Sequence, residues 1–382
     1  MDFNLSEDQR LLKDEIIRFA KAELSPGARE RDELHQFPRE QWDKCGEMGL
    51  QGLVVPPEYG GSGLDALSAA IALEALGYGC DDGGLVFAIC AHLLACVVPI
   101  WKHGTEAQKQ RYLPDLSKGR LIAVNAMTEP AGGSDAFAMS TRAVADGDHF
   151  VVNGAKTFSS NGPVADLAVL YANTNPDKAY LGGVTAFLVE RDTPGFIKGQ
   201  TFHKMGLRSC AIGELVFEDA RVPRSAVLGA VGGGGPIFAQ SMEWERVCLV
   251  AAHVGTMQRL LEQAVDYART RKVFGKRIGE FQAVSHAIAD MKVRLEASRL
   301  LVYHAASRLS SGRTVGMDAS ITKLFVSEAL VKSAMDTVQI LGGYGFMTEY
   351  GVERTLRDAV GGTIYSGTSQ MQRNIIAGWL GL

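Results

Sequence analysis

Several motifs that mark common enzyme chemistries are absent from this 382-residue sequence. It has no GxGxxG motif opening a βαβ unit, no GxxxxGK(S/T) phosphate loop, no HExxH zinc motif and no GxSxG nucleophile elbow. These absences argue against a Rossmann dinucleotide-binding protein, a P-loop nucleotidase, a zinc peptidase and a simple serine hydrolase. We also expect no metal site.

The chain likewise lacks long blocks of one charge and paired cysteines. Its 39 basic and 43 acidic residues give a formal net charge of −4, which argues against an electrostatic nucleic-acid binder. The six cysteines show no CxxC spacing, and a chain of this length needs no disulfide staples. We interpret them as buried free thiols of a cytoplasmic protein: Cys45, Cys80, Cys90, Cys96, Cys210 and Cys248.

No targeting segment is evident at the N-terminus, which is acidic and has no apolar h-region, so we expect a cytoplasmic location. One apolar run, Leu85–Trp101, approaches the roughly 20 residues that span a bilayer. It contains His92 and Pro99, and the neighbouring predicted helices are amphipathic. A buried core helix is therefore favoured over a membrane span, and no membrane association is expected.

The hydrophobic pattern divides the chain into three regions. Residues 1–118 show helical periodicity, starting with a capping box at Ser6 and Gln9. Residues 119–230 hold short runs rich in Val, Phe, Leu and Thr between turn signals, which predict strands of an antiparallel sheet, barrel- or sandwich-like. Residues 231–382 return to long helical segments that favour a four-helix bundle. The predicted class is α+β, with Gly232–Gly235 as the one plausible flexible linker.

A series of segments, in fixed order from Met127 to Gln370, resembles the acyl-CoA dehydrogenase family over essentially the whole chain. Any single segment could occur by chance, but the ordered set is specific. The matching segments are Met127–Pro130 with Gly133–Asp135, Lys204–Gly206 with Val216–Asp219 and Val222–Pro223, Arg271–Lys276 with Gln282, Gln339–Gly345, Arg357–Ala359 and Ile364–Gln370.

The resemblance implies FAD as the cofactor and assigns residues to it. Met127, Thr128, Gly133 and Ser134 would face the flavin ring and pyrophosphate, and Phe158, Ser159 and Ser160 would cover the ring. Many members carry Trp where this chain has Phe158, and a strand Phe packed in the core is the alternative. A neighbouring subunit would grip the dinucleotide through Arg271, Phe274, Gln282, Gln339, Gly342 and Gly343, and Thr368 and Gln370 would close the site.

The guanidinium of Arg271 suits a pyrophosphate, and a solvated cation at a helix end is its alternative. A site shared in this way implies a homo-oligomer, expected to be a tetramer.

The catalytic base is displaced in this sequence. The chemistry needs a carboxylate to remove the α-proton of the thioester while a hydride moves to flavin. The usual family position for that carboxylate is Ser366 here. Branches such as the isovaleryl-CoA and long-chain dehydrogenases place the base on an earlier helix, at the position that matches Glu245. We therefore expect Glu245 to be the base and Ser366 to supply a backbone N–H to the thioester oxygen.

The sequence also bears on the molecule that carries the thioester. Ser134, Glu243 and Arg246 are expected substrate contacts, and the arginine that would hold a CoA phosphate is replaced by Thr314 after Ser311–Arg313. With the small residues at 360–363, this favours a carrier-protein-bound acyl or prolyl group of secondary metabolism over a short or branched acyl-CoA. The expected electron acceptor is a flavoprotein or oxygen. A non-catalytic FAD-binding relative is the hypothesis from another class.

Overall fold

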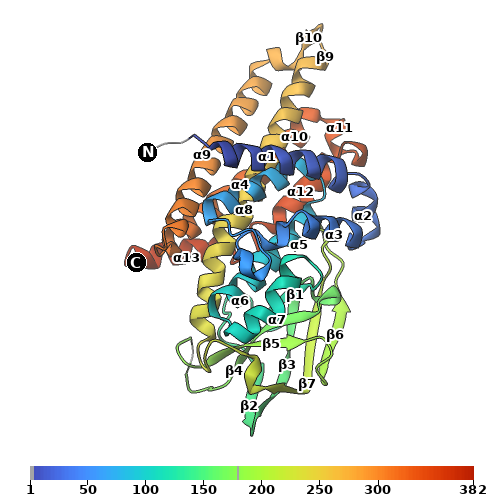
Figure 1. Ribbon diagram of the computed structural model, residues 1–382. Coiled ribbons are helices and arrows are strands. Elements are labelled where there is room, and N and C mark those ends of the chain that lie inside the picture. The colour runs from blue at the N-terminus through green and yellow to red at the C-terminus, as the bar shows by residue number, and fades with distance from the viewer. Residues whose placement is uncertain (1–3, 179) are drawn as a thin grey trace.

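A computed structural model describes residues 4–178 and 180–382 (Figure 1). The N-terminal region is helical, and the predicted capping box of Ser6 and Gln9 begins α1. A second capping box, Thr105 with Gln108, begins α7. The helices are α1 (Glu7–Phe19), α2 (Ala28–Leu34), α3 (Arg39–Glu47), α4 (Ala66–Gly79), α5 (Gly83–His92), α6 (Val98–His103) and α7 (Glu106–Ser117), with π-helical turns η1 (Ala20–Leu24) and η4 (Leu93–Val97).

The predicted apolar run forms one continuous rod of α5, η4 and α6. By length and composition Gly83–His103 could cross a membrane, and 94% of its most apolar window is buried inside the protein. This burial agrees with the expected core helix. All six cysteines are buried free thiols, as expected.

The central region is one eight-stranded sheet in the order β6-β7-β3-β2-β4-β5-β8, with β1 paired to β4. Its strands are β1 (Ala123–Ala126), β2 (Arg142–Asp146), β3 (His149–Ser160), β4 (Leu167–Asn173), β5 (Val184–Glu190), β6 (Phe196–Thr201), β7 (Ile212–Pro223) and β8 (Val227–Leu228). β4 and β5 are buried along almost their whole length, which explains their continuous apolar sequence.

The predicted antiparallel sheet needs one correction. Most neighbouring strands are antiparallel, but β1 runs parallel to β4, from Ala123 opposite Leu167 to Ala126 opposite Leu170. β2 also pairs with β4 in parallel, at Arg142 and Asn173, and the sheet is therefore mixed. The parallel pairing of β1 with β4 is possible because β2 and β3 lie between the two strands in the chain and form a long crossover. In the described residues β6 and β8 are the two ends of the strand order, so no barrel closes.

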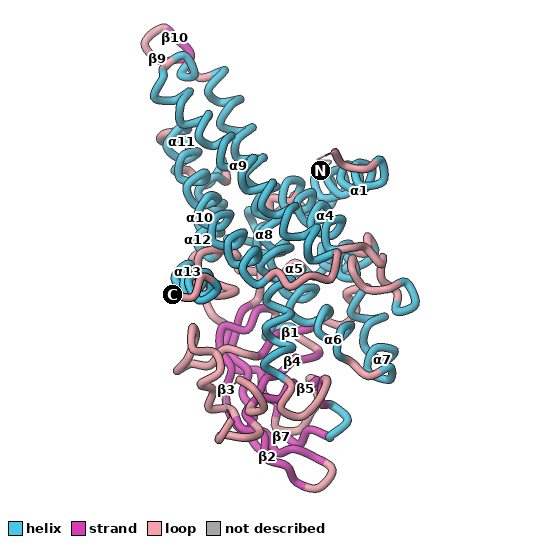
Figure 2. The backbone as a smooth tube through the Cα atoms, turned by 90° about the vertical axis from the view of Figure 1, so that its left-hand side faces the viewer, coloured by secondary structure: helices cyan, strands magenta, loops and turns pink. Residues whose placement is uncertain are grey.

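The C-terminal region is the predicted helical bundle. Figure 2 shows α8, α9 and α10 running side by side, with α13 crossing near the C-terminus. The helices are α8 (Gly234–Thr270), α9 (Gln282–Ser310), α10 (Gly316–Leu341), α11 (Gly343–Phe346), α12 (Val352–Gly361) and α13 (Ser369–Trp379). The hairpin β9 (Lys272–Val273) and β10 (Lys276–Arg277) joins α8 to α9. The boundaries at 118/119 and 230/231 remain a prediction.

The glycine run at 232–235 is a close-packed junction and not the flexible linker that its composition predicted. A Cβ built on Gly235 would lie 2.4 Å from the carbonyl oxygen of Tyr180, and one on Gly234 would lie 2.9 Å from that of Val184. Only glycine allows the start of α8 to approach the sheet so closely.

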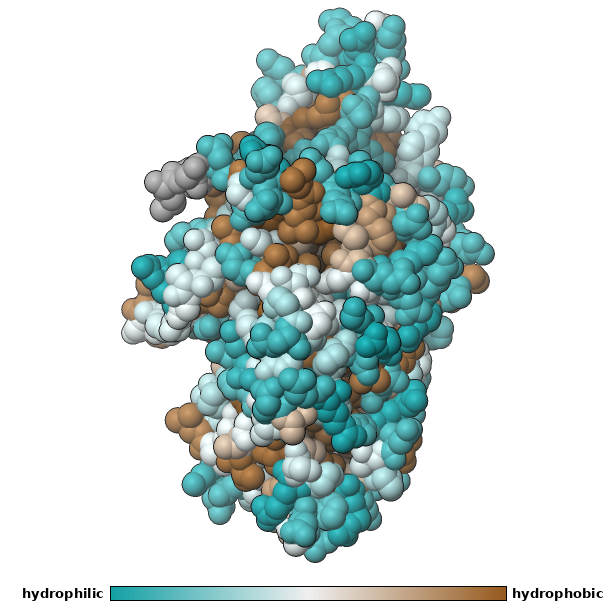
Figure 3. All heavy atoms as spheres, in the orientation of Figure 1, coloured by the Kyte–Doolittle hydropathy of each residue, from teal (hydrophilic) through white to brown (hydrophobic). Residues whose placement is uncertain are grey.

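Exposed apolar side chains gather at the end of the bundle farthest from the sheet. Phe274 in the hairpin is 94% exposed and Phe346 is 74% exposed. Figure 3 shows a hydrophobic patch below this hairpin, with further hydrophobic areas in the middle and lower parts of the same face. Such a gathering is typical of a surface that another protein chain covers.

Candidate active site

A cavity of about 380 Å³ lies where the sheet meets the helices. Side chains from α5, η4, the end of β1, β3, the start of α8, the loop after α12, and α13 form its walls. The structure thus brings together predicted residues that lie far apart in the sequence. They are Met127, Thr128, Gly133, Ser134, Phe158, Ser160, Glu245, Arg246 and Ser366.

Glu245 is the buried carboxylate of this cavity. Its side chain projects from α8, is 7% exposed and accepts a hydrogen bond from the hydroxyl of Ser366. Burial raises the pKa of Glu245, while the Ser366 hydroxyl and the cations of Arg246 and Lys323 oppose this rise. A carboxylate whose pKa is raised and which accepts a hydrogen bond from one hydroxyl is well suited to accept a proton.

The turn at Ser366 and Gly367 is fixed by bonds to its carbonyl oxygens. Arg246 Nε donates to the Ser366 oxygen at 3.0 Å, and buried Lys323 Nζ donates to the Gly367 oxygen at 2.7 Å. Gln372 Nε2 donates to both carbonyl oxygens. Ser366 itself has a left-handed backbone with φ of 54°. Because these bonds occupy only carbonyl oxygens, the Ser366 N–H stays available for a thioester oxygen.

A buried ion pair holds the segment that begins at Met127. Lys156 is fully buried, and its Nζ donates to the Met127 carbonyl oxygen at 3.0 Å and to Glu129 Oε1 at 2.8 Å. Burial lowers the pKa of Lys156 to about 8, which leaves it mostly charged at neutral pH. Burial of Glu129 is outweighed by its hydrogen bonds, which lower its pKa to about 2. Since Thr157 N also donates to the Thr128 oxygen at 2.8 Å, the segment is held rigidly.

Phe158 lies in the cavity wall and not in the core. Its ring is 68% exposed, its φ is 52°, and it packs on Phe202 with ring centroids 5.5 Å apart. An exposed aromatic ring on strained backbone at a cavity is unusual unless another group covers it. Ser159 is buried and does not line the cavity, unlike its neighbours Phe158 and Ser160.

Other predicted residues lie elsewhere. Arg271, Gly342 and Gly343 line a separate cavity of about 490 Å³ beside the β9–β10 hairpin, at the opposite end of the molecule from the sheet in Figure 1. The guanidinium of Arg271 lies 5.5 Å from the centre of the Tyr344 ring. Phe274, Gln282 and Gln339 are exposed near this end.

The structure does not gather three further predicted residues into the first cavity. Thr368 caps α13 by accepting from Met371 N, and Gln370 is exposed. Glu243 is half-buried and faces Gly316 at the start of α10. The assigned roles of these three residues remain predictions.

The residues present fit a flavin dinucleotide, with the groups suited to it lying in two separate cavities of the chain. Phe158 offers an uncovered ring beside a rigid backbone segment. At the other end, a Cβ built on Gly342 or Gly343 would meet no atom within 4 Å, so backbone there is open to a second molecule. The exposed guanidinium of Arg271 can donate paired hydrogen bonds to the oxygens of a pyrophosphate. Among the described residues, no group of His, Cys, Asp and Glu could hold a metal ion.

Fold and site together define a flavin-dependent dehydrogenase of acyl thioesters. The family descriptions "Acyl-CoA dehydrogenase, N-terminal domain", "middle domain" and "C-terminal domain" match residues 6–120, 125–220 and 232–381. The chain therefore belongs to the acyl-CoA dehydrogenase family.

Among its relatives is an L-prolyl peptidyl-carrier protein dehydrogenase of Pseudomonas fluorescens, 45% identical, with 99% of each chain covered. A Serratia enzyme of the same description is 43% identical over 100% of this chain and 99% of its own. The crystal structure of the prolyl acyl carrier protein oxidase AnaB superposes with a TM-score of 0.98 at 43% identity, covering 99% of this chain and 100% of AnaB. A structure of PigA with FAD and proline also gives 0.98 at 43% identity, with both chains fully covered.

Sequence reasoning missed several residues of the site. Lys156 and Lys323 carried a signal, because each is a lone cation among apolar positions of a strand or helix. Tyr365 lies within the matching segment Ile364–Gln370 but was given no role, and Phe87 carried no signal, since an aromatic residue in an apolar segment is usually an ordinary core residue.

Proposed function

We propose that this chain oxidises a prolyl group held as a thioester on a peptidyl carrier protein, with FAD as its cofactor. The observation that carries the proposal is the buried Glu245 carboxylate bonded to Ser366 within the cavity. The similarity to prolyl-carrier dehydrogenases over nearly the whole chain supports the substrate class.

The proposed roles follow from the geometry. Glu245 takes the α-proton of the thioester, because its raised pKa makes the carboxylate a better proton acceptor. The Ser366 N–H donates to the thioester oxygen as negative charge develops there. Arg246 holds the Ser366 carbonyl and so fixes the direction of that N–H. FAD, when bound, accepts the hydride that leaves the substrate with the electron pair.

We propose that the flavin is held by Met127, Thr128, Gly133, Ser134, Phe158 and Ser160 of one subunit and by Arg271, Gln282 and Gly342–Gly343 of its neighbour. The separation of the two cavities within one chain supports this division. The exposed Phe274 is suited to the same interface. We further propose a homotetramer, and a flavoprotein or oxygen as the electron acceptor.

A short-chain acyl-CoA dehydrogenase is the second candidate. A short-chain-specific acyl-CoA dehydrogenase of Clostridium acetobutylicum is 40% identical over 99% of both chains. Against this candidate stands Thr314, which follows Arg313 where the family pattern suggests a phosphate-binding arginine.

Anaerobic flavin reduction distinguishes the two candidates. Prolyl carrier protein, prolyl-CoA, butyryl-CoA and isovaleryl-CoA would be mixed separately with the yellow holoenzyme in a stopped-flow spectrophotometer. We expect prolyl carrier protein to bleach the flavin fastest. Equal kcat/KM for the prolyl group on CoA and on the carrier would contradict carrier recognition, and faster reduction by butyryl-CoA would favour the second candidate.

A further inference from the structure

Asn125 is the one polar residue of β1, a strand that is otherwise buried and apolar. Val124 and Ala126 pack in the core on one face of the sheet, whereas Ala123 and Met127 pack toward the helices. Because side chains alternate along a strand, Asn125 faces the helices too, and there it lines the active-site cavity. Asparagine is disfavoured in strands, so its presence here calls for a reason.

The amide of Asn125 has no partner in the protein. Its oxygen is buried and accepts no hydrogen bond, and within residues 4–178 and 180–382 its NH₂ group donates none. The end of an asparagine side chain rotates easily, so the amide can present its oxygen to a donor in the cavity. A buried amide without a partner costs stability, and native proteins keep few of them. Its retention at a cavity points to a ligand that supplies the missing bond.

The helices opposite Asn125 leave room for such a ligand. The N–H of Ala123 donates to His92 Nδ1 at 3.0 Å and so fixes β1 against α5. From the rod formed by α5 and η4, Ala91 and Ala95 face the same cavity. Their methyl groups are small and cannot pair with an amide. The space before Asn125 is therefore left to the bound molecule.

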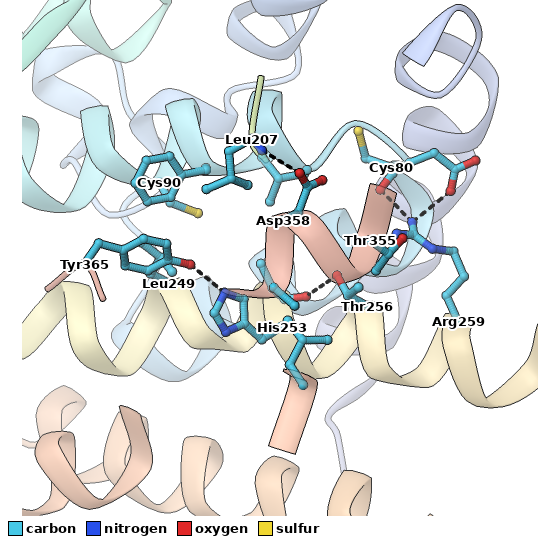
Figure 4. A pocket seen from close by; sticks show the side chains of 17 residues that line it. Cys80, Cys90, Leu207, Leu249, His253, Thr256, Arg259, Thr355, Asp358 and Tyr365 are labelled. Atoms are coloured by element: carbon cyan, nitrogen blue, oxygen red, sulfur yellow. Dashed lines mark hydrogen bonds and ion pairs between the residues drawn. The ribbon is translucent and has the colours of Figure 1, made fainter. Parts of the chain in front are cut away.

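The neighbouring cavity of about 50 Å³, drawn in Figure 4, shows a contrast. There the Tyr365 hydroxyl and His253 Nε2 share a hydrogen bond of 2.8 Å, and Asp358 accepts from the Leu207 N–H. Figure 4 shows both bonds joining groups of the protein to each other. These groups stabilise the packing of the chain, whereas the Asn125 amide is free to bind a ligand.

The base lies close to both elements that flank Asn125. Burial raises the pKa of Cys96 on η4 and of Tyr171 on β4, and the Glu245 carboxylate adds to both rises. β4 is the strand paired with β1. The α-carbon of the substrate must lie at Glu245, and in a prolyl group the ring nitrogen is bonded to that carbon. The nitrogen is thus placed within the part of the cavity that Asn125 lines.

We propose that Asn125 recognises the substrate, its amide oxygen accepting a hydrogen bond from the ring nitrogen of the prolyl group. This inference rests on the proposed function, since it takes a prolyl group as the substrate. A plain acyl group of equal size has no donor and would leave the amide unpaired. A site built to form a hydrogen bond rejects an analogue that lacks the group. Asn125 therefore selects for an amino-acyl group by its chemistry and not by its size.

The test crosses two enzymes with two substrates. Wild-type holoenzyme and Asn125→Leu would each be reduced anaerobically by prolyl and by cyclopentanecarbonyl carrier protein, in which CH₂ replaces the ring NH. Leucine keeps the size of the side chain and removes its hydrogen bonds. Comparing each substrate across the two enzymes cancels its intrinsic reactivity. We expect kcat/KM for prolyl to fall by roughly 10- to 100-fold relative to cyclopentanecarbonyl, as for loss of a bond to a charged donor.

Binding and stability give readouts besides activity. Carrier proteins that hold the same two acyl groups through an amide in place of the thioester would be titrated in a calorimeter. We expect Asn125→Leu to weaken binding of the prolyl form alone. The Tm of the variant should stay the same or rise, because an apolar side chain replaces an unpaired polar one. A merely structural role would instead lower the Tm and affect both acyl groups equally.

Asn173→Leu is the matched control. The side-chain oxygen of Asn173 on β4 is also buried without a partner, but this residue does not line the cavity. The same substitution there should leave the ratio of the two substrates unchanged. Asn125→Ala removes the amide with a smaller side chain and replaces the leucine variant if that one does not fold.

The outcomes separate the inference from the proposed function. If wild type oxidises the prolyl carrier and both Asn125 variants keep its substrate ratio, recognition by Asn125 is wrong. Loss of FAD with equal falls for both substrates would place the amide at the flavin and would also overturn the inference. If wild type fails to oxidise the prolyl carrier, yet Asn125→Leu still weakens binding of the amide-linked prolyl form alone, the recognition stands and the proposed reaction falls.

Discussion

Glu245 is the only carboxylate among the predicted site residues that reaches the active-site cavity, and this makes its replacement the sharpest test of mechanism. Glu245→Gln preserves size and removes proton acceptance. General-base catalysis is typically worth roughly 100- to 10,000-fold, so we expect flavin reduction to slow by about that order. Stopped-flow absorbance would give the rate, and the flavin spectrum would show that FAD stays bound.

Glu243→Gln is the matched comparison for this prediction. It makes the same change two residues earlier on α8, on a carboxylate that faces the start of α10. We expect a much smaller effect than at Glu245. The assignment would be wrong if Glu245→Gln left reduction intact while Glu243→Gln abolished it.

Ser366 is expected to influence catalysis through the pKa of Glu245. Its hydroxyl donates to the carboxylate and so lowers that pKa against the effect of burial. Removing the hydroxyl should raise the pKa further. Because Glu245 must be deprotonated to accept a proton, the acid limb of the rate profile should move to higher pH, while the rate at high pH is retained.

Ser366→Gly tests this shift most cleanly, because glycine adopts the observed φ of 54° without strain and keeps the backbone N–H. Ser366→Ala also removes the hydroxyl and should move the limb in the same direction. The measurement is the rate of flavin reduction across pH. Unchanged profiles for both variants would contradict a link between Ser366 and the base.

At the scale of elements, the position of α8 depends on its contact with α4. A Cβ built on Gly77 of α4 would lie 2.0 Å from the Ala252 carbonyl oxygen, and one on Gly255 of α8 would lie 2.0 Å from that of Glu74. Gly77→Ala should therefore push apart two helices that cannot repack. Overpacking typically costs about 1–3 kcal/mol, so we expect a clearly lower Tm of the holoenzyme by calorimetry.

Gly378→Ala is the control for this crossing. Gly378 lies in α13, and a Cβ there would meet no atom within 4 Å. Alanine favours helix over glycine by up to about 1 kcal/mol, so the Tm should stay the same or rise slightly. An equal fall in Tm for both variants would contradict the prediction that close packing of α4 on α8 makes Gly77→Ala destabilising.

At the scale of the whole molecule, oligomerisation and FAD retention should be coupled. Phe274 is 94% exposed at the hairpin, next to the Arg271 cavity. We expect Phe274→Asp to weaken assembly and to release FAD, because the dinucleotide would lose its second set of contacts. Analytical ultracentrifugation and the ratio of flavin to protein would be measured together.

Val144→Asp is a control for added surface charge, since Val144 is 63% exposed on β2 at the opposite end of the molecule. It should leave both assembly and flavin content unchanged. A wild-type monomer carrying one FAD per chain would rule out the shared site.

The sequence predicted much of this protein because local patterns encode local structure. The capping box at Ser6 and Gln9, the helical periodicity on both sides of the sheet and the apolar core helix all agree with the structure. The motif from Met127 and the candidate base Glu245 were also predicted. Each of these predictions depends on residue types within a short window or on an ordered series of motifs. Both kinds of signal can be read from the sequence alone.

Other features were decided only by tertiary structure, because they join residues that no short window contains. The parallel pairing of β1 with β4 depends on a long crossover. The bond from Ser366 to Glu245 links residues 121 positions apart. Phe87 and Tyr365 come from segments far apart in the sequence, yet their ring centroids lie 4.6 Å apart. Pattern predicts which face of an element is buried, whereas the partner across the core is fixed only when the elements pack.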